Sequence, residues 1–423
     1  MRFRFTVILI FLSVISSPTL GQEDTAEYWM NSAKDAFKTG SYDSSIESLD
    51  RAISVEPRNA TFWTMKGFVS EAMGRYEESL DCYNRSLEIN SKDANVWYAR
   101  AIAQRNLNRT NESIQSIDRA LEIDPQNDAI WYDRGTTFLI AKRYDEAILC
   151  YDEAIRINSS WPWPWYNRGL ALKESGRYDE ALLSYENATA LDQNYTKAWS
   201  EMGTILAGMG RFEEGLAAFE RAVEVNPQDS VSLSNKARAL LDLKRYEDAV
   251  AAYDDALAID PGDPASWYSK GIALAELGRY GDSLQALSRC LNISPNSTQA
   301  WYAKSAVLKG MGETEQSDEA WSMYQDLTYS HIRFSDNRGG SIEDAIVIMN
   351  AIGEMDGVGS EYYYLEKKFG KKEVDWDLTM QSTVGEDGRD YDKMDIRLAS
   401  GEETTIYFDI TDFYGKWLEG LGL

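Results

Sequence analysis

Few side chains in this sequence could carry catalytic chemistry. The 423 residues include one histidine, His331, so a Ser-His-Asp arrangement would have to use it and a multi-histidine metal site is impossible. The C-terminal part holds neither a cysteine nor a glycine-rich phosphate loop. What remains is hydrolysis by paired carboxylates, such as Asp409 and Asp412. We therefore expect no enzyme, no cofactor and no metal, and a carboxylate-based hydrolase in the C-terminal domain is the alternative.

Acidic residues also gather around a predicted hairpin near residue 388. Asp387, Asp390, Asp392 and Asp395 offer the oxygen ligands that calcium prefers. Their spacing does not match an EF-hand loop, and charged hairpin tips are usually solvated. We predict solvated carboxylates, with a calcium site as the alternative.

The three cysteines, Cys82, Cys150 and Cys290, lie far apart at positions that a helix would bury. Three cannot all pair, and a free buried cysteine packs as a small hydrophobic side chain. We predict core thiols, and a disulfide between two of them stays open.

The chain is strongly acidic, with 69 acidic and 43 basic residues and a net charge of −26. Its pI near 4.5 gives a field that repels phosphate backbones and anionic lipids. We expect neither a nucleic-acid partner nor a lipid-binding site.

The first 21 residues are predicted to be a secretory signal peptide. Arg2 and Arg4 precede an apolar run over 5–15, and small residues lead to Gly21, the predicted cleavage point. The run is shorter than the ~20 residues of a membrane-spanning helix, although an uncleaved anchor is the alternative. We expect an exported, extracytoplasmic protein, at the cell surface or secreted.

Asparagines in Asn-x-Ser/Thr triplets are unusually dense. They are Asn59, Asn84, Asn108, Asn111, Asn158, Asn187, Asn194, Asn292 and Asn296. Most fall at predicted turns, where a glycan does not disturb packing. We predict a glycoprotein, and the alternative is that Asn and Ser are simply common turn residues.

The elements that carry these residues follow a 34-residue period. The series is Trp29, Trp63, Trp97, Trp131, Trp165, Trp199, Leu233, Trp267 and Trp301. Such a period indicates stacked units, each here with two amphipathic helical patterns. A small residue, such as Gly135, follows four residues after most of the tryptophans, on the same helix face. We expect the indole rings to form one continuous buried spine.

Each unit also has its own turn residues. The first pattern ends at Gly40, Gly74, Asn108, Gly176, Gly210, Gly278 or Gly312, which suit a left-handed C-cap, with Lys142 and Lys244 as exceptions. An aromatic and acidic residues then begin a second helix, and a proline often ends the unit. The whole pattern, W-x3-G…Y-[DE]-x-A-x3-[YF]-x2-A…P, resembles the tetratricopeptide repeat (TPR).

The resemblance covers residues 26–331 as nine repeats, which start at 26, 60, 94, 128, 162, 196, 230, 264 and 298. It implies a right-handed α-solenoid whose first helices line a concave groove for a protein or peptide. After a linker (332–341) we expect a small α+β domain (342–423), so that the fold is mainly α.

The resemblance also indicates which residues face the groove. The residue after the repeating Trp is Tyr98, Tyr132, Tyr166, Tyr268 or Tyr302, with Ser200 and Ser234 between the two tyrosine tracts. Tyrosine is enriched at interfaces, so we predict partner contacts here. The alternative is that the rings stack on each other or line a merely solvated groove.

Trp161 and Trp163 alternate with Pro162 and Pro164 at the entrance to the fifth repeat. The prolines are predicted to hold both rings outward as a binding hot spot. The alternative is that the rings fold back onto the neighbouring loop.

Basic residues stand where the family favours Leu, three residues after the Trp. They are Lys66, Arg100, Arg134, Arg168, Lys236, Lys270 and Lys304. We predict that their stems cover apolar surface and their charges pair with nearby acids. A polyanion-binding strip is the alternative. The Lys and Asn pattern of TPR proteins that clamp a C-terminal carboxylate is not matched, so that activity is not expected.

The tail is predicted to contain strands at 345–348, 374–384, 391–398 and 404–410 and a helix at 360–369. The segments 354–357, 391–394 and 407–416 resemble a domain that follows TPR arrays in exported proteins of methanogenic archaea, for which no activity is implied. Together these features predict an exported TPR scaffold that mediates protein or peptide binding. A structural component of the cell envelope is a third possibility, beside the hydrolase.

Overall fold

The described chain consists of helix pairs followed by a small sheet domain. The structure, a computed structural model, describes residues 25–341, 344–349, 354–386 and 389–411, with the backbone alone for 354–358. The chain divides into two compact units, Met1–Asn226 and Pro227–Leu423, and each is described by itself.

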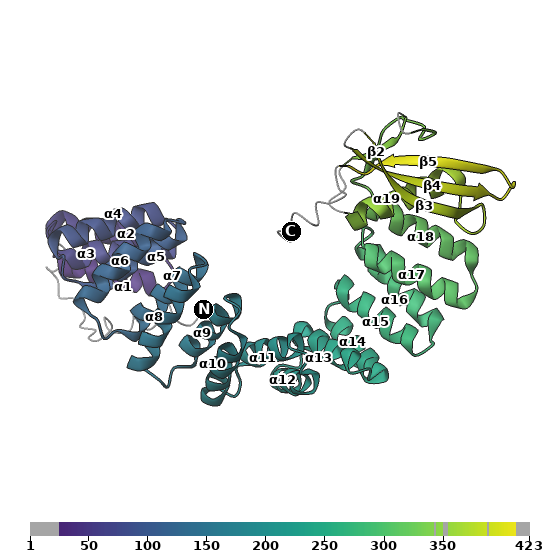
Figure 1. Ribbon diagram of the computed structural model, residues 1–423. Helices are drawn as coiled ribbons and strands as arrows, with labels where there is room; N and C mark the ends of the chain where they lie inside the picture. The colour runs from purple at the N-terminus through teal and green to yellow at the C-terminus, as the bar shows by residue number, and fades with distance from the viewer. Residues whose placement is uncertain (1–24, 342–343, 350–353, 387–388, 412–423) are drawn as a thin grey trace. The chain divides into compact units, whose positions relative to one another are not determined.

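Unit 1 contains six antiparallel helix pairs (Figure 1). The first helices are α1 (Ala26–Lys38), α3 (Ala60–Ala72), α5 (Ala94–Asn106), α7 (Asp128–Ile140), α9 (Pro162–Glu174) and α11 (Thr196–Gly208). The second helices are α2 (Tyr42–Val55), α4 (Tyr76–Ile89), α6 (Thr110–Ile123), α8 (Tyr144–Ile157), α10 (Tyr178–Leu191) and α12 (Phe212–Val225). Each second helix packs on its own first helix, and α2 to α10 also pack on the next first helix. Stacking therefore buries apolar faces that one pair alone would leave exposed.

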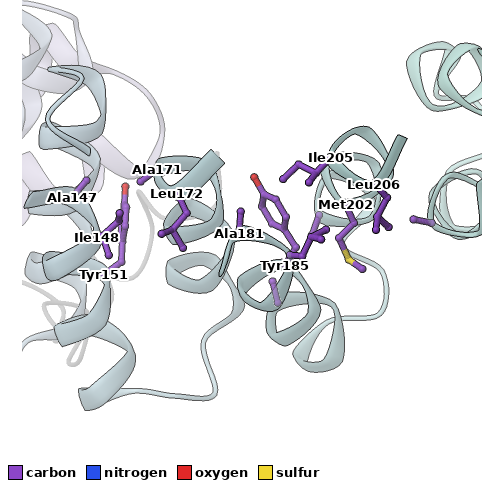
Figure 2. Packing of buried hydrophobic residues seen from close by; sticks show 14 of the residues in the cluster. Ala147, Ile148, Tyr151, Ala171, Leu172, Ala181, Tyr185, Met202, Ile205 and Leu206 are labelled. Atoms are coloured by element: carbon purple, nitrogen blue, oxygen red, sulfur yellow. The ribbon is translucent and has the colours of Figure 1, made fainter. Parts of the chain in front are cut away.

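Glycines allow the two helices of a pair to approach closely. A Cβ atom on Gly135 would lie 2.7 Å from Cε1 of the Tyr151 ring, and Gly67, Gly169 and Gly203 meet a Tyr or Phe ring in the same way. Tyr151 is fully buried, and Figure 2 shows it between neighbouring helices together with Ala147 and Ile148. The small residue four positions after the tryptophan is therefore needed because a ring occupies the space beside it.

The turn residue that follows the first helix of each pair takes the left-handed backbone conformation, whether or not it is a glycine. Gly40, Gly74, Gly176 and Gly210 have φ angles between 74° and 77°, and Asn108 has φ 60°. Lys142 (φ 58°) and, in unit 2, Lys244 (φ 59°) adopt the same backbone. A side chain makes this conformation cost ~1–2 kcal/mol, so the two lysines carry local strain that the stacked helices impose.

Unit 2 begins with three more helix pairs. They are α13 (Ser230–Asp242) with α14 (Tyr246–Ile259), α15 (Pro264–Glu276) with α16 (Tyr280–Ile293), and α17 (Thr298–Met311) with α18 (Thr314–Thr328). The predicted fold class, nine helix hairpins followed by a small α+β domain, is confirmed.

A five-stranded sheet and one helix form the rest of unit 2. The strands are β1 (Arg333–Phe334), β2 (Ile346–Met349), β3 (Trp376–Glu386), β4 (Arg389–Leu398) and β5 (Glu403–Asp409), and the helix is α19 (Glu354–Phe369). Their order is β1-β2-β5-β4-β3, with β2 and β5 parallel and the other neighbours antiparallel. Leu365 of α19 packs on Trp376, Met394 and Phe408 of the sheet. Strand β1 lies inside the segment predicted as a linker.

The sheet domain is attached to the last helix pair through α19 (Figure 1). The hydroxyl of Tyr363 donates to Oδ1 of Asp326 on α18 at 2.9 Å, and Lys367 lies 2.7 Å from the same oxygen. The Tyr363 ring also stacks on Tyr329, with centroids 5.2 Å apart. The domain thus covers part of the surface that a terminal repeat would leave exposed.

Candidate partner-binding surface

The repeating tryptophans attach each first helix to the turn before it. The indole Nε1–H of Trp131 donates to the carbonyl oxygen of Pro125 at 3.0 Å. Equivalent bonds, also to the residue six positions earlier, are made by Trp63, Trp97, Trp165, Trp199, Trp267 and Trp301. These rings are half-buried, so the expected spine of buried indoles is wrong in this respect. The reason is geometric, because the N–H must reach a turn at the surface.

The basic residues three positions later have a structural role. Arg134 lies over the Trp131 ring, 5.4 Å from its centroid, and its Nη2 is 2.9 Å from Oδ1 of Asp118 on the preceding helix. The same pairing, sixteen residues back in the sequence, is made by Arg168 with Asp152, Lys66 with Asp50 and Lys270 with Asp254. These contacts confirm the predicted structural role for Lys66, Arg134, Arg168 and Lys270, since the carboxylates take up charge that a polyanion would need. Arg100 instead donates to Oγ of Ser116 at 3.2 Å, and Lys304 lies over the Trp301 ring.

Tyrosines of unit 1 are fixed by polar residues of the next repeat. The hydroxyl of Tyr98 donates to Asp133, and Nδ2 of Asn167 donates to the hydroxyl of Tyr132 at 2.9 Å. Burial, and then the Asp133 carboxylate, raise the pKa of Tyr98 well above its ordinary value. The hydroxyl of Tyr98 therefore keeps its proton, stays uncharged and donates to Asp133, which fixes the position of the ring.

Aromatic rings from the inter-repeat turns lie against these tyrosines. The centroid of Trp161 is 4.7 Å from that of Tyr132 and 6.0 Å from that of Trp163, and Tyr195 is 4.9 Å from Tyr166. All five rings are half-buried. The prolines therefore do not hold Trp161 clear of the protein as predicted, because its ring gains contact area on Tyr132.

Trp161 and Tyr195 occupy positions that other repeats use to cap a first helix. Side chains that accept a helix N–H are found at Thr25, Asn59, Asp93, Asn127, Asp229, Asp263 and Ser297. Trp161 and Tyr195 accept no such bond. Removing a capping side chain costs ~1 kcal/mol of stability. The fifth and sixth repeats lack this stabilising cap and carry an aromatic ring in its place. Tyr195 is not among the predicted residues, and the interruption in this series of caps is the signal that could have found it.

The two predicted groove tyrosines of unit 2, Tyr268 and Tyr302, differ in exposure. Tyr268 is half-buried and packs against the two clusters that contain Leu287 and Cys290. Tyr302 is 53% exposed, with Tyr324 and Trp321 of α18 at centroid distances of 5.4 and 6.1 Å. Tyr302 is thus part of an exposed aromatic group that the repeat pattern alone does not predict.

Comparison with known proteins agrees with this arrangement of helices and tryptophans. Models described as Tetratricopeptide repeat match residues 94–127, 117–148, 162–195, 200–264 and 235–298, and one described as TPR repeat matches 71–108 and 137–176. Together the matches extend over more than half of the chain. The chain is a tetratricopeptide repeat protein. No curated protein is significantly similar to it in sequence.

Solved structures share the TPR fold. The C-terminal part of a TPR repeat-containing protein from Cytophaga hutchinsonii is 16% identical, with a TM-score of 0.50, over 57% of this chain and 98% of that chain. A tetratricopeptide repeat protein from Parabacteroides merdae is 18% identical, with a TM-score of 0.44, over 59% and 98%. YrrB, described as a TPR protein with an unusual peptide-binding site, is 21% identical, with a TM-score of 0.42, over 45% and 98%.

The candidate glycosylation sites lie on the surface of the TPR array. Asn59, Asn108, Asn158, Asn194 and Asn296 lie in turns or at helix ends, whereas Asn84, Asn111, Asn187 and Asn292 lie within second helices. None of the nine is buried. The three cysteines are free and buried, and burial raises the pKa of Cys82 and Cys150 to about 11. They are core thiols, as predicted.

The carboxylates of the sheet domain do not gather at one point. Asp395 pairs with Lys393 and accepts a bond from Thr405, whereas Asp392 lies on the face of β4 that packs against α19. Asp409 accepts from Arg389 at 2.9 Å. Asp387 and Asp412 lie outside the described residues. Among the residues that are described, no group of three or more His, Cys, Asp or Glu could hold a metal ion, and no helix is long and apolar enough to cross a membrane.

Proposed function

We propose that the protein is an exported scaffold that binds a protein or peptide along the first helices of repeats three to six. The observation that carries this proposal is the aromatic group of Tyr132, Trp161, Trp163, Tyr166 and Tyr195. Two of these five rings stand where a capping side chain would stabilise the fold. Two adjacent repeats therefore lack the side-chain cap that other first helices have, with no evident gain in stability. Such a departure from a local folding rule is typical of a functional surface.

The chemistry of this aromatic group favours an uncharged, partly apolar partner segment. Two pairs of charged side chains on these helices are already in contact, with Arg105 Nη1 3.7 Å from Asp133 and Lys173 Nζ 2.9 Å from Glu201. Half-buried aromatic rings that contact one another lose little freedom on binding, which reduces the entropic cost of association. An extended peptide could therefore gain apolar contact area and hydrogen bonds without having to displace an ion pair.

Other features support the remaining parts of the proposal. Tyr98 extends the surface toward the third repeat, and Tyr268 and Tyr302 offer a second contact in unit 2. The predicted signal peptide over 1–21 and the nine Asn-x-Ser/Thr asparagines, none of which is buried, support an extracytoplasmic glycoprotein. The resemblance of the tail to archaeal exported proteins supports a methanogenic host.

Photo-crosslinking tests the binding surface. Full-length protein with p-benzoylphenylalanine in place of Trp163 is incubated with detergent-solubilised native envelope and irradiated. The matched control carries the same photoprobe in place of Tyr178, an exposed tyrosine of the second helix α10. We expect a discrete crosslinked species from position 163 only.

The dependence on the aromatic group is tested in the same assay. Adding Trp161→Ala to the photoprobe variant should remove the crosslink, while thermal stability changes little because the ring is only half-buried. Equal crosslinking from positions 163 and 178, or no effect of Trp161→Ala, would refute the proposed surface.

A further inference from the structure

A pocket in unit 2 lies where the tyrosine tract is interrupted. It has a volume of about 570 Å³ and is formed by α13, the second helix α14 and the start of α15. Its lining includes Ser234, Asn235, Tyr253, Ser266 and Ser269. Ser234 is the residue that replaces the groove tyrosine in the seventh repeat.

Two other repeats show what normally occupies the equivalent space. In the fourth repeat, Tyr132 lies between Tyr151 of the second helix and Trp161 of the following turn, at centroid distances of 5.9 and 4.7 Å. In the fifth repeat, Tyr166 lies in the same way beside Tyr185 and Tyr195, at 5.7 and 4.9 Å. A phenol ring over the second-helix tyrosine is therefore a recurring arrangement in this protein.

The seventh repeat keeps one ring of this arrangement and lacks the other two. Tyr253 stands 19 residues after Ser234, as Tyr151 does after Tyr132 and Tyr185 after Tyr166. Ser234 replaces the central tyrosine, and Asp263 replaces the ring of the following turn. The pocket beside Tyr253 thus includes the space of the phenol ring that is missing at Ser234 and the space of the ring that is missing at Asp263.

A partner for the phenol hydroxyl is also present. In the third and fourth repeats the groove tyrosine bonds to the residue 35 positions later, Tyr98 to Asp133 and Tyr132 to Asn167. The residue at that position in the seventh repeat is Ser269, which lines the pocket. Its hydroxyl already bonds to that of Tyr253. Because a serine hydroxyl has one donor and two acceptor positions, it can also bond to the phenol of a ligand.

The charged groups of the pocket already have partners. Oδ1 of Asp260 accepts from the backbone N–H of Gly262 at 3.0 Å, and Asp263 accepts from that of Ala265 at 3.0 Å. Arg238 is paired with Asp242 at 3.2 Å. A neutral ring therefore fits the pocket better than an anion, which would have to displace one of these contacts.

We infer that this pocket binds a tyrosine side chain of the partner, in the place that a groove tyrosine fills in the fourth and fifth repeats. The inference rests on the proposed function, since it names one side chain of the peptide that the scaffold would hold. It commits to a phenol, so that leucine and phenylalanine side chains bind more weakly.

The test titrates full-length protein with N-acetyl-L-tyrosinamide and follows saturation-transfer NMR. We expect a dissociation constant on the order of 1 mM, which is reasonable for so small a ligand. N-acetyl-L-leucinamide should bind at least about tenfold more weakly than N-acetyl-L-tyrosinamide. Ser234→Tyr should abolish binding, because its own ring fills the space. Leu183→Tyr adds the same side chain at an exposed position of the second helix α10 and should leave binding unchanged.

Ser269→Ala provides a second variant that adds no volume to the pocket. It should weaken N-acetyl-L-tyrosinamide severalfold and leave N-acetyl-L-phenylalaninamide unaffected, because only the hydroxyl contact is lost. No saturable binding of the tyrosine probe, or equal binding by Ser234→Tyr and the wild-type chain, would overturn the inference. Binding of the probe does not depend on the crosslinked partner. The inference about the pocket can therefore be refuted while crosslinking supports the proposed surface of unit 1, and the reverse.

Discussion

A buried carboxyl in the sheet domain makes the stability of this protein depend on pH. Glu361 of α19 is 0% exposed, and its carboxyl group lies beside the buried carboxyl of Asp392 on β4. Burial, and then the neighbouring Asp392, raise the pKa of Glu361 from 4.5 to about 9. Glu361 is therefore protonated in the folded chain at neutral pH and ionised in the unfolded chain.

The sign and size of the effect follow from proton linkage. Between the unfolded and folded pKa values, the folded chain binds one more proton than the unfolded chain. The free energy of unfolding consequently falls as pH rises from 4.5 toward 9, by about 1.4 kcal/mol per pH unit, and levels off above the folded pKa. At pH 7 the accumulated loss is about 3 kcal/mol.

Glu361→Gln removes this titration with little change of shape. The difference in unfolding free energy between the variant and the wild-type chain should grow by about 1.4 kcal/mol for each pH unit between pH 5 and pH 8. Unfolding of the domain can be followed in urea through the 19F resonance of 5-fluorotryptophan at Trp376, which is 1% exposed and packs in the same core. Titrating groups other than the neighbouring Asp392 are common to both proteins and cancel in the difference.

The Asp392→Asn variant separates the two causes of the shift. Removing the neighbouring charge should lower the pKa of Glu361 and reduce the slope without abolishing it, because burial remains. A stability difference between Glu361→Gln and wild type that does not change with pH would refute the buried-carboxyl reasoning.

Three further predictions concern the repeats and the compartment. Lys142→Gly and Lys244→Gly should each raise the free energy of unfolding by about 0.5–1 kcal/mol in urea titrations, since glycine adopts the left-handed backbone without strain; unchanged or lower stability would count against this. Trp131→Phe should cost about 1 kcal/mol through loss of the indole bond to Pro125, and a neutral effect would mean that this bond does not stabilise the turn. N-terminal sequencing of native protein should begin near residue 22, and intact-mass measurement should show added glycan that decreases with Asn194→Gln; a native chain that keeps the leader and has the unmodified mass would contradict both expectations.

Much of the repeat architecture was predictable because its determinants are local. The small residue four positions after the repeating tryptophan, the left-handed turn residues and the acidic first turns of the second helices act within one helix pair. Repetition then makes a weak local signal strong. The strands and helix of the tail were predicted for the same reason, except β1, whose two residues are too few to show a periodicity and form a strand only by pairing with β2.

The candidate site was predicted in part. Tyr98, Tyr132 and Tyr166 were identified by their place beside the tryptophan. Tyr195, and the group formed by Trp321 and Tyr324 with Tyr302, were not, because their contacts join residues from different helices or turns.

The amino-acid sequence by itself determined the period, the helix pairs and the identity of each groove position, because hydrophobic spacing and turn chemistry operate over a few residues. Only the tertiary structure decided which surfaces those residues share. It placed Trp161 on Tyr132 in place of open solvent, left a pocket beside Tyr253, and removed Glu361 from water next to Asp392. The physical reason is that burial and ring contacts depend on the neighbouring helix, which lies many residues away in the chain.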